Sequence, residues 1–322
     1  MSNLTSSTSE FLLLEFSQVR GLQILHFFVF LALYLTTLIG NLFIIIAIAL
    51  DYRLHTPMYF FLMNLAICDL GTISVIVPKS MHNSLMNSRV ISYSECLAQV
   101  FFFFFFEASD FALLTIMAHD RHVAICNPLQ YEIIMNKGTC IKMVIVVWII
   151  ALLHAMFNTG STFSMTFCSN TVDQFFCEIP RLLKLSCSDL YLVEVGMLVL
   201  GFSVALGCFI FIIATYVQIF TAVHKIRSAQ ARQKALSTCL PHLTVVSVFM
   251  FSSLFVYARP PSYISSVLDL VIAVIYTILP PMLNPFIYSM RNKEIQTALY
   301  KLLNLKHFSN NTPRFILKLL GM

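Results

Sequence analysis

Charged residues are scarce in this chain. Only 11% of its 322 residues are Asp, Glu, Lys or Arg, whereas 58% are hydrophobic. A soluble domain carries about 25% charged residues, so this composition argues against a soluble protein and leaves no room for a separate soluble domain. The net charge is only +5, and it gives no support to nucleic-acid binding.

Sequence signals of several membrane-protein and enzyme classes are also missing. Residues 267–290 contain no lysine, which excludes a retinal Schiff base of the opsin or light-driven pump type. The chain has no repeated halves with broken helices at corresponding positions, as a transporter would show. It contains neither a His-Glu-x-x-His spacing nor a nucleophile elbow, so nothing indicates an enzyme.

Long hydrophobic runs, by contrast, are abundant. A hydrocarbon core of ~30 Å needs about 20 residues of helix, and seven stretches reach that length. The sequence therefore predicts an all-α membrane protein with a seven-transmembrane helix bundle at 24–290, a tail at 1–23 and a cytoplasmic helix and tail at 291–322. The seven stretches are roughly 24–50, 58–79, 98–119, 140–161, 192–222, 236–258 and 267–290.

Basic residues predict the orientation of this bundle. With the N-terminus outside, 14 of the 20 Lys and Arg residues face the cytosol, as the positive-inside rule expects. No cleavable signal peptide is evident, so we expect the first helix to act as an anchor in the plasma membrane. The sequon at Asn3 then lies outside, where we expect glycosylation. Apolar residues of 292–303 share one face, which predicts an amphipathic helix on the inner leaflet.

Cysteines on the exterior side can form disulfides, because that compartment is oxidising. The four are Cys96, Cys168, Cys177 and Cys187. They allow two disulfides in three connectivities, which the residues alone do not separate. Three of them lie in the exterior loop at 162–191, whose length is typical of a functional lid.

An acid and a base stand together at the end of the third apolar run, at Asp120-Arg121. Arg121 lies 25 residues after Cys96, which is about 37 Å of helix, so the two residues sit at opposite membrane faces. Glu107 and Asp110 fall between them, near the midplane. A carboxyl group there indicates either a functional site or a protonated acid bonded to a neighbouring helix.

Polar residues at comparable depth in other helices form a second candidate site. Asp69, Asn41 and Asn284 could bind one another, ordered water or a sodium ion, or form a purely structural cluster. We expect no other cofactor. Pro285 removes a backbone donor and kinks the last helix. Tyr288 follows one turn later, and a kinked helix that re-aims this residue toward Arg121 would be a bistable element.

Five motifs show a resemblance to a known family. They are Gly40-Asn41, Leu54 to Leu62, Met117 to Cys126, Lys234 to Cys239 and Pro281 to Asn292. Together they resemble the motif series of vertebrate olfactory (odorant) receptors, within the rhodopsin-like class A G-protein-coupled receptors, over nearly the whole chain. The Asp-Arg and Asn-Pro motifs are shared by all class A receptors, whereas the Leu-His-Thr-Pro-Met-Tyr and Lys-Ala…Ser-Thr-Cys runs are more specific to the olfactory branch.

The resemblance implies a function and its partners. It implies a small volatile odorant bound within the helices and a stimulatory, olfactory-type heterotrimeric G protein that raises cyclic AMP. The alternative is a class A receptor of the same fold that senses a metabolite outside the olfactory epithelium. By position, Asp120, Arg121 and Tyr288 would form the G-protein switch. The pocket would comprise Phe103, Phe104, Glu107, Ala108, Val204, Ser253, Tyr257 and Tyr276.

The resemblance also implies a disulfide pairing, and it has three departures. Cys96 would pair with Cys177 and Cys168 with Cys187, with Cys96–Cys187 as the competing assignment. His122 replaces the tyrosine usual after Asp-Arg, and Phe249-Met250-Phe251 stands where many members have Phe-Tyr-Gly. Pro241 occupies a position where a small residue is common, and it is expected to kink the sixth helix.

Overall fold

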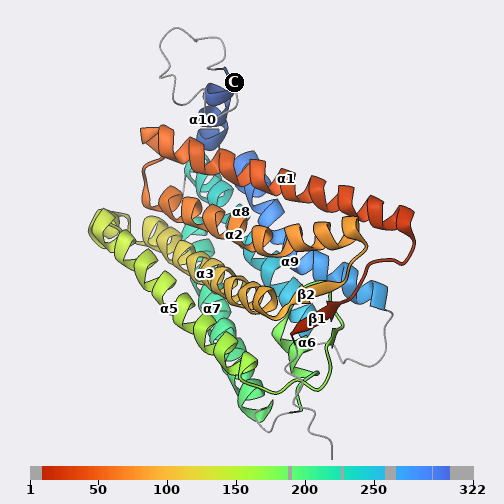
Figure 1. Cartoon of the computed structure of the whole chain (residues 1–322). Helices are drawn as coiled ribbons and strands as arrows, with labels where there is room; N and C mark the ends of the chain where they lie inside the picture. The colour runs from red at the N-terminus through yellow and green to blue at the C-terminus, as the bar shows by residue number, and fades with distance from the viewer. Residues whose placement is uncertain (1–8, 188–190, 226–227, 258–265, 292, 305–322) are drawn as a thin grey trace, which may run out of the picture.

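The computed structural model describes residues 9–187, 191–225, 228–257, 266–291 and 293–304. Seven long helices pack side by side in these ranges (Figure 1). Six of them are long and apolar enough to span a membrane, and α8 carries a shorter apolar stretch at Ala235–Phe251. The predicted seven-helix bundle is confirmed. Its helices are α1 (Arg20–Leu50), α2 (Pro57–Met86), α3 (Tyr93–Cys126), α5 (Lys137–Phe163), α7 (Tyr191–Lys225), α8 (Ala229–Tyr257) and α9 (Ser266–Arg291).

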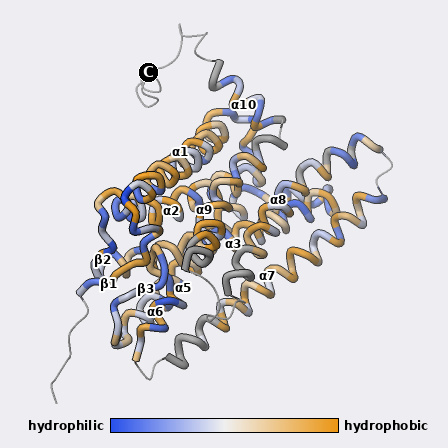
Figure 2. The backbone as a smooth tube through the Cα atoms, turned by 90° about the vertical axis from the view of Figure 1, so that its right-hand side faces the viewer, coloured by the Kyte–Doolittle hydropathy of each residue, from blue (hydrophilic) through white to orange (hydrophobic). Residues whose placement is uncertain are grey.

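Apolar side chains face outward on the peripheral helices. Figure 2 shows hydrophobic residues along most of α1 and along the coloured part of α7. Only 22% of the apolar window of α1 and 17% of that of α7 are buried inside the protein, against 61% for α2. In water such exposed surface would be costly, but a lipid bilayer is an apolar solvent for it. The exposure therefore agrees with a chain that crosses the membrane several times.

A polar cap extends α3 beyond its apolar run. Ser92 and Glu95 form a capping box, in which the Ser92 hydroxyl accepts the Glu95 backbone N–H and the Glu95 carboxylate accepts that of Ser92. This arrangement satisfies two donors that would otherwise be unpaired. It begins α3 at Tyr93, whereas hydropathy alone predicts a start near residue 98. α1 begins at Arg20 rather than residue 24, although its N-cap residue, Val19, makes no side-chain hydrogen bond.

A small sheet covers the outer end of the bundle, and the sequence analysis did not predict it. β1 (Glu10–Leu13) lies between β2 (Val90–Ser92), which is antiparallel to it, and β3 (Thr171–Val172), which is parallel. Phe11 and Leu13 of β1 are buried. Part of the expected N-terminal tail is therefore a packed strand. Asn3 lies outside the described residues.

Two disulfides fix the same end. They join Cys96 to Cys177 and Cys168 to Cys187, with Cα atoms 5.5 and 5.8 Å apart. This is the pairing that the family resemblance implies, and the competing bond between Cys96 and Cys187 is wrong. The loop between α5 and α7, residues 164–190 and here called loop 2, also contains the short helix α6 (Ile179–Leu183).

A short helix, α10 (Lys293–Asn304), follows α9 at the opposite end of the bundle and confirms the predicted amphipathic helix (Figure 1). Its buried face includes Ile295 and Ala298. Tyr59 of α2 donates a hydrogen bond to Glu294 at 2.5 Å, which ties α10 to the bundle. The remaining elements at this end are η1 (Tyr52–Leu54), η2 (Pro128–Gln130) and α4 (Tyr131–Ile134).

An ion pair joins the end of α1 to α10. Asp51 lies between α1 and η1 and bonds Arg53 through both carboxylate oxygens, at 3.0 and 2.6 Å. Lys301 of α10 lies 3.9 Å from Asp51. The hydrogen bond from Arg53 lowers the pKa of Asp51 to about 2. Asp51 therefore stays ionised at any physiological pH.

Candidate functional site

An aromatic cluster lies where loop 2 enters the outer end of the bundle. Phe176 of the loop packs against Phe103 of α3, with ring centroids 5.5 Å apart, and against Tyr276 of α9 at 6.4 Å. Phe104 packs at the edge of this cluster, its ring 6.0 Å from that of His154 on α5. The structure thus brings together three of the predicted pocket residues and adds an aromatic residue from the loop.

The other predicted pocket residues are not part of this cluster. Glu107 and Ala108 lie about one turn further along α3 and are half-buried. Val204 on α7 is 60% exposed, which is the environment of a lipid contact rather than of an enclosed pocket, so its predicted role is not supported. The side chains of Ser253 and Tyr257 lie outside the described residues.

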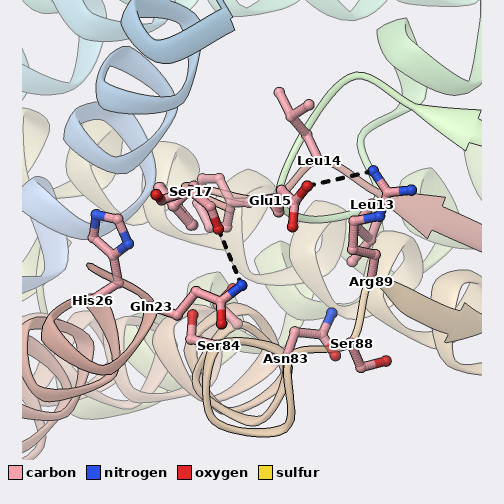
Figure 3. Close-up of a pocket in the computed structure, with 13 residues that line it drawn as sticks. Leu13, Leu14, Glu15, Ser17, Gln23, His26, Asn83, Ser84, Ser88 and Arg89 are labelled. Carbon is pink, nitrogen blue, oxygen red and sulfur yellow. Dashed lines mark hydrogen bonds and ion pairs between the residues drawn. The ribbon is translucent and has the colours of Figure 1, made fainter. Parts of the chain in front are cut away.

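A separate polar pocket lies at the outer ends of α1 and α2. Figure 3 shows its lining, which comes from the segment after β1, from α1 and α2, and from the ion pair of Glu15 and Arg89 at 3.8 Å; Phe175 of loop 2 also lines it. The buried His26 Nδ1 and Asn83 Oδ1 atoms find no hydrogen-bond partner among the described residues, which do not include 1–8. The space in which a water molecule can be centred is about 30 Å³. That is room for one or two waters, which such groups require, and is too little for an odorant.

Two of the predicted central polar residues bind each other directly. The Asn284 side-chain amide of α9 donates to both carboxylate oxygens of Asp69 on α2, at 3.0 and 2.9 Å. Both side chains are buried. A hydrogen bond inside a bilayer satisfies groups that lipid cannot, so this contact fixes the depth at which α2 and α9 meet.

The third central residue, Asn41, has a different partner. Its amide donates to the backbone carbonyl of Pro281 at 3.1 Å rather than to Asp69. Pro285 has no N–H, so it cannot donate to the carbonyl four residues earlier, which is that of Pro281. Asn41 therefore satisfies the carbonyl that the proline leaves unpaired. At the neighbouring Gly40, a Cβ would lie only 2.9 Å from the Pro285 ring, which explains why a glycine suits that position.

Three carboxyl groups gather near this centre. Asp69, Asp110 and Glu107 interact electrostatically. The Asp110 Oδ1 and Asn284 Oδ1 atoms are buried and have no hydrogen-bond partner in the described ranges. Carboxylate and amide oxygens are the donors that hard cations prefer. Among the described residues, however, no group of three or more His, Cys, Asp or Glu side chains is arranged to hold a metal ion, so the sodium ion expected at Asp69, Asn41 and Asn284 stays a prediction.

The predicted switch residues lie together at the cytosolic end. Asp120 and Arg121 are buried, and the Tyr131 hydroxyl donates to Asp120 at 2.9 Å. Burial and the neighbouring Asp120 raise the pKa of Tyr131, so its hydroxyl stays protonated and able to donate. Within the described part of the chain, the Arg121 Nε and Nη2 atoms have no hydrogen-bond partner, and neither has the buried Tyr288 hydroxyl. Tyr288 lies within electrostatic range of Arg121.

Beside Arg121 lies a polar contact that the sequence analysis missed. His242 of α8 bonds the Tyr216 hydroxyl of α7 at 2.8 Å and the Leu114 carbonyl of α3 at 3.0 Å, and it is fully buried. It therefore joins three helices at one level. The available signal was a histidine within the apolar run at 236–258, where an ionisable residue is a functional-site hypothesis by default.

A bundle with a buried acid–base pair at its cytosolic end and an aromatic cluster under a disulfide-fixed loop at its outer end has the architecture of a seven-helix receptor. Residues 30–306 match the family described as Olfactory receptor. The protein is therefore a receptor and not an enzyme. The human Olfactory receptor 14C36 is 49% identical over 95% of this chain and 99% of its own length.

Other relatives are equally extensive in their coverage. The human Olfactory receptor 14I1 is 49% identical over 94% of this chain and 97% of its own length, and the gorilla Olfactory receptor 1G1 is 47% identical over 94% and 96%. The chain therefore belongs to the olfactory receptor family, within the rhodopsin-like receptors, and is a multi-pass protein of the plasma membrane.

Proposed function

We propose that this protein is an odorant receptor that binds a small volatile molecule within the helix bundle and activates a stimulatory, olfactory-type G protein, raising cyclic AMP. The observation that carries the proposal is the state of Arg121. Its guanidinium is buried at the cytosolic end, and two of its nitrogens lack hydrogen-bond partners among the residues that the structure describes. A buried charge without full hydrogen bonding is costly, so a partner that supplies acceptors has a large effect there.

The outer half of the bundle supports an apolar ligand. Phe103, Phe104 and Tyr276 supply aromatic walls from α3 and α9, and loop 2 contributes Phe176. Small-molecule sites are mostly apolar, with a few polar groups that fix orientation. A site of this composition would take a small apolar molecule with one hydrogen-bonding group.

Ligand and G protein would act on one equilibrium. A ligand that binds better when the cytosolic face is open shifts the population toward that form. Opening requires the contacts among α3, α7 and α8 at Leu114, Tyr216 and His242 to separate, because they join the three helices beside Arg121. Arg121 would then be free to meet the G-protein α subunit.

The test is a cyclic-AMP reporter line that expresses this chain and is screened against a diverse odorant panel. For any odorant that activates the wild type, Arg121→Ala should abolish the response while surface expression is retained. Arg53→Ala is the matched control, because Arg53 is a half-exposed arginine at the same end of the bundle, paired with Asp51. Its response should persist. A full response from Arg121→Ala, or equal loss in both variants, would contradict the proposal.

A further inference from the structure

The carboxyl group of Glu178 is buried in loop 2, directly after the disulfide-bonded Cys177. Its side chain is only 2% exposed. The Tyr276 hydroxyl of α9 donates to it at 2.5 Å, and Tyr276 is also buried. An acidic residue in a loop normally faces water, so a buried acid with a buried phenolic donor is a placed contact rather than a surface one.

The same segment of loop 2 is fixed firmly to α3. Cys177 is bonded covalently to Cys96, and its backbone N–H donates to the Gln99 side chain at 2.8 Å. Gln99 in turn donates to the Val75 carbonyl of α2 at 3.1 Å. On the side of α2 and α3 the loop therefore cannot leave without breaking a covalent bond. Toward α9, the Glu178 contact is a hydrogen bond, which can open and close.

Aromatic side chains just before Glu178 project into the bundle. Phe176 packs on Phe103 and Tyr276, as described above. Phe175 packs on Phe16 and on Phe30 of α1, with ring centroids 5.2 and 6.0 Å apart. The loop thus covers the aromatic cluster, and the Glu178–Tyr276 bond lies at the α9 edge of this cover.

Charged groups near Glu178 come from its own loop. Burial raises the pKa of Glu178, whereas the Tyr276 hydrogen bond, Arg181, Gln174 and Lys184 oppose that shift. A carboxyl group accepts a hydrogen bond from a phenol in either protonation state. The contact with Tyr276 therefore does not depend on the charge of Glu178, although its strength does.

The position of Tyr276 on α9 connects this cover to the cytosolic switch. Tyr276 precedes Tyr288 by 12 residues, or about 18 Å of helix. Pro280, Pro281 and Pro285 lie between them. Each proline removes one backbone hydrogen bond, so this part of α9 bends more easily than a regular helix. A displacement of the Tyr276 end can thus change the angle at which the Tyr288 end meets Arg121.

We propose that Glu178 and Tyr276 form a latch that holds loop 2 closed over the aromatic cluster, and that a ligand beneath the loop acts on α9 through this pair. Both are positioning residues. The second half of the proposal rests on the proposed odorant-receptor function, whereas the first half does not. The occupant is a small apolar molecule that fits beneath Phe176 while loop 2 is closed over it.

The latch itself is tested without any ligand, by hydrogen–deuterium exchange of the purified receptor in lipid nanodiscs. Leaving the buried carboxyl group of Glu178 without this donor costs about 1–3 kcal/mol, so Tyr276→Phe should speed exchange across residues 174–178 by about 5- to 150-fold. Tyr93→Phe is the matched control, because the Tyr93 hydroxyl also makes one bond at the outer end, to the Phe163 carbonyl at 2.8 Å. It should leave exchange in 174–178 unchanged.

Variants of the acid separate hydrogen bonding from packing. Glu178→Gln keeps an acceptor oxygen and should exchange close to the wild-type rate, whereas Glu178→Leu should resemble Tyr276→Phe. Unchanged exchange in Tyr276→Phe, or equal acceleration in Tyr93→Phe, would overturn the latch. If Glu178→Leu does not reach the cell surface, the comparison of Tyr276→Phe, Tyr93→Phe and Glu178→Gln decides the question.

The ligand half is tested with any odorant that activates the wild-type receptor in the cyclic-AMP reporter. Tyr276→Phe should raise the half-maximal concentration about tenfold or more, on the same hydrogen-bond scale. Glu178→Gln keeps an acceptor oxygen, so its half-maximal concentration should stay within about threefold of the wild-type value. Equal potency in wild type and Tyr276→Phe would overturn this half. If no odorant activates the wild type, the proposed function fails instead, and the exchange result still decides whether the latch exists.

Discussion

Asn41 and Pro285 should be thermodynamically coupled, although they lie 244 residues apart in the sequence. Asn41→Leu removes the amide that donates to the Pro281 carbonyl at 3.1 Å. That carbonyl is then buried among α1 and α9 with no donor, because Pro285 supplies none. An unsatisfied buried acceptor costs about 1–3 kcal/mol, and we expect a destabilisation of that size.

Restoring the backbone donor should remove most of this cost. In Pro285→Ala, residue 285 regains an N–H, which can donate to the carbonyl of residue 281 as in a regular helix. Asn41→Leu in that background should therefore cost little. Hydrogen bonds between membrane helices contribute about 0.6 kcal/mol on average and up to about 1.7, so the coupling should be about 0.6–1.7 kcal/mol.

The assay is thermal unfolding of the four purified variants in nanodiscs. At about 2 °C for each kcal/mol, Asn41→Leu should lower the melting temperature by about 2–6 °C. Asn64→Leu is the matched control, since Asn64 is also buried but bonds the Phe60 carbonyl of its own helix at 2.8 Å. It should show no coupling to Pro285→Ala. If the effects of Asn41→Leu and Pro285→Ala add to within about 0.5 kcal/mol, the assigned role of Asn41 is wrong.

Three further outcomes are expected. Burial raises the pKa of Glu178, so the stabilisation of the fold by its protonated carboxyl group is fully present below the ordinary carboxyl pKa of about 4.3 and is lost as the pH rises through the raised pKa. The melting temperature of the wild type should fall over that pH range, whereas that of Glu178→Gln should not. His242→Phe removes the bonds to Tyr216 and α3, so cyclic AMP measured without odorant should rise, and an unchanged basal signal would count against a restraining role. The leucine side chain of Gly71→Leu would overlap the Phe106 ring and should destabilise the protein by about 1–3 kcal/mol. Thermal unfolding should show that adding Phe106→Ala restores part of this stability.

Hydropathy and residue spacing predicted the main architecture because the bilayer imposes it. Span length decides which stretches become helices. The distribution of Lys and Arg predicts the orientation. Depth along each helix also placed Asp69 and Asn284 at one level, and the structure joins them. Depth alone does not give rotation about a helix axis. For that reason Val204 was predicted for the pocket although its side chain is 60% exposed.

Contacts with backbone atoms were beyond the reach of residue patterns. The comparable depth of their polar side chains predicts that Asn41 lies near Asp69, but depth does not show whether a side chain bonds a backbone atom instead. The actual partner of Asn41 is a carbonyl, which every residue carries, and only the position of Pro285 marks that carbonyl as unpaired. The rule that a proline frees the carbonyl four residues earlier could have identified Pro281 as the acceptor.

The sequence also could not predict the long-range pairing of the short strands. β1 pairs with residues about 80 and 160 positions later, and strands of two to four residues are too short to show a period. The burial of Glu178 follows from that packing, together with the disulfide at Cys177. From the sequence alone, an acidic residue in a long exterior loop is expected to be solvated.

The polar ties of α9 show why this helix can carry a signal. Its outer end bonds loop 2 through Tyr276, its centre bonds α1 through the Pro281 carbonyl and α2 through Asn284, and its inner end brings Tyr288 near Arg121. Each tie is a directional hydrogen bond or a local charge interaction, and prolines have removed backbone bonds between them. Packed apolar surfaces resist gradual deformation, whereas hydrogen bonds exchange between discrete partners. A ligand at the outer end would therefore change the cytosolic end by switching partners along α9 rather than by compressing the core.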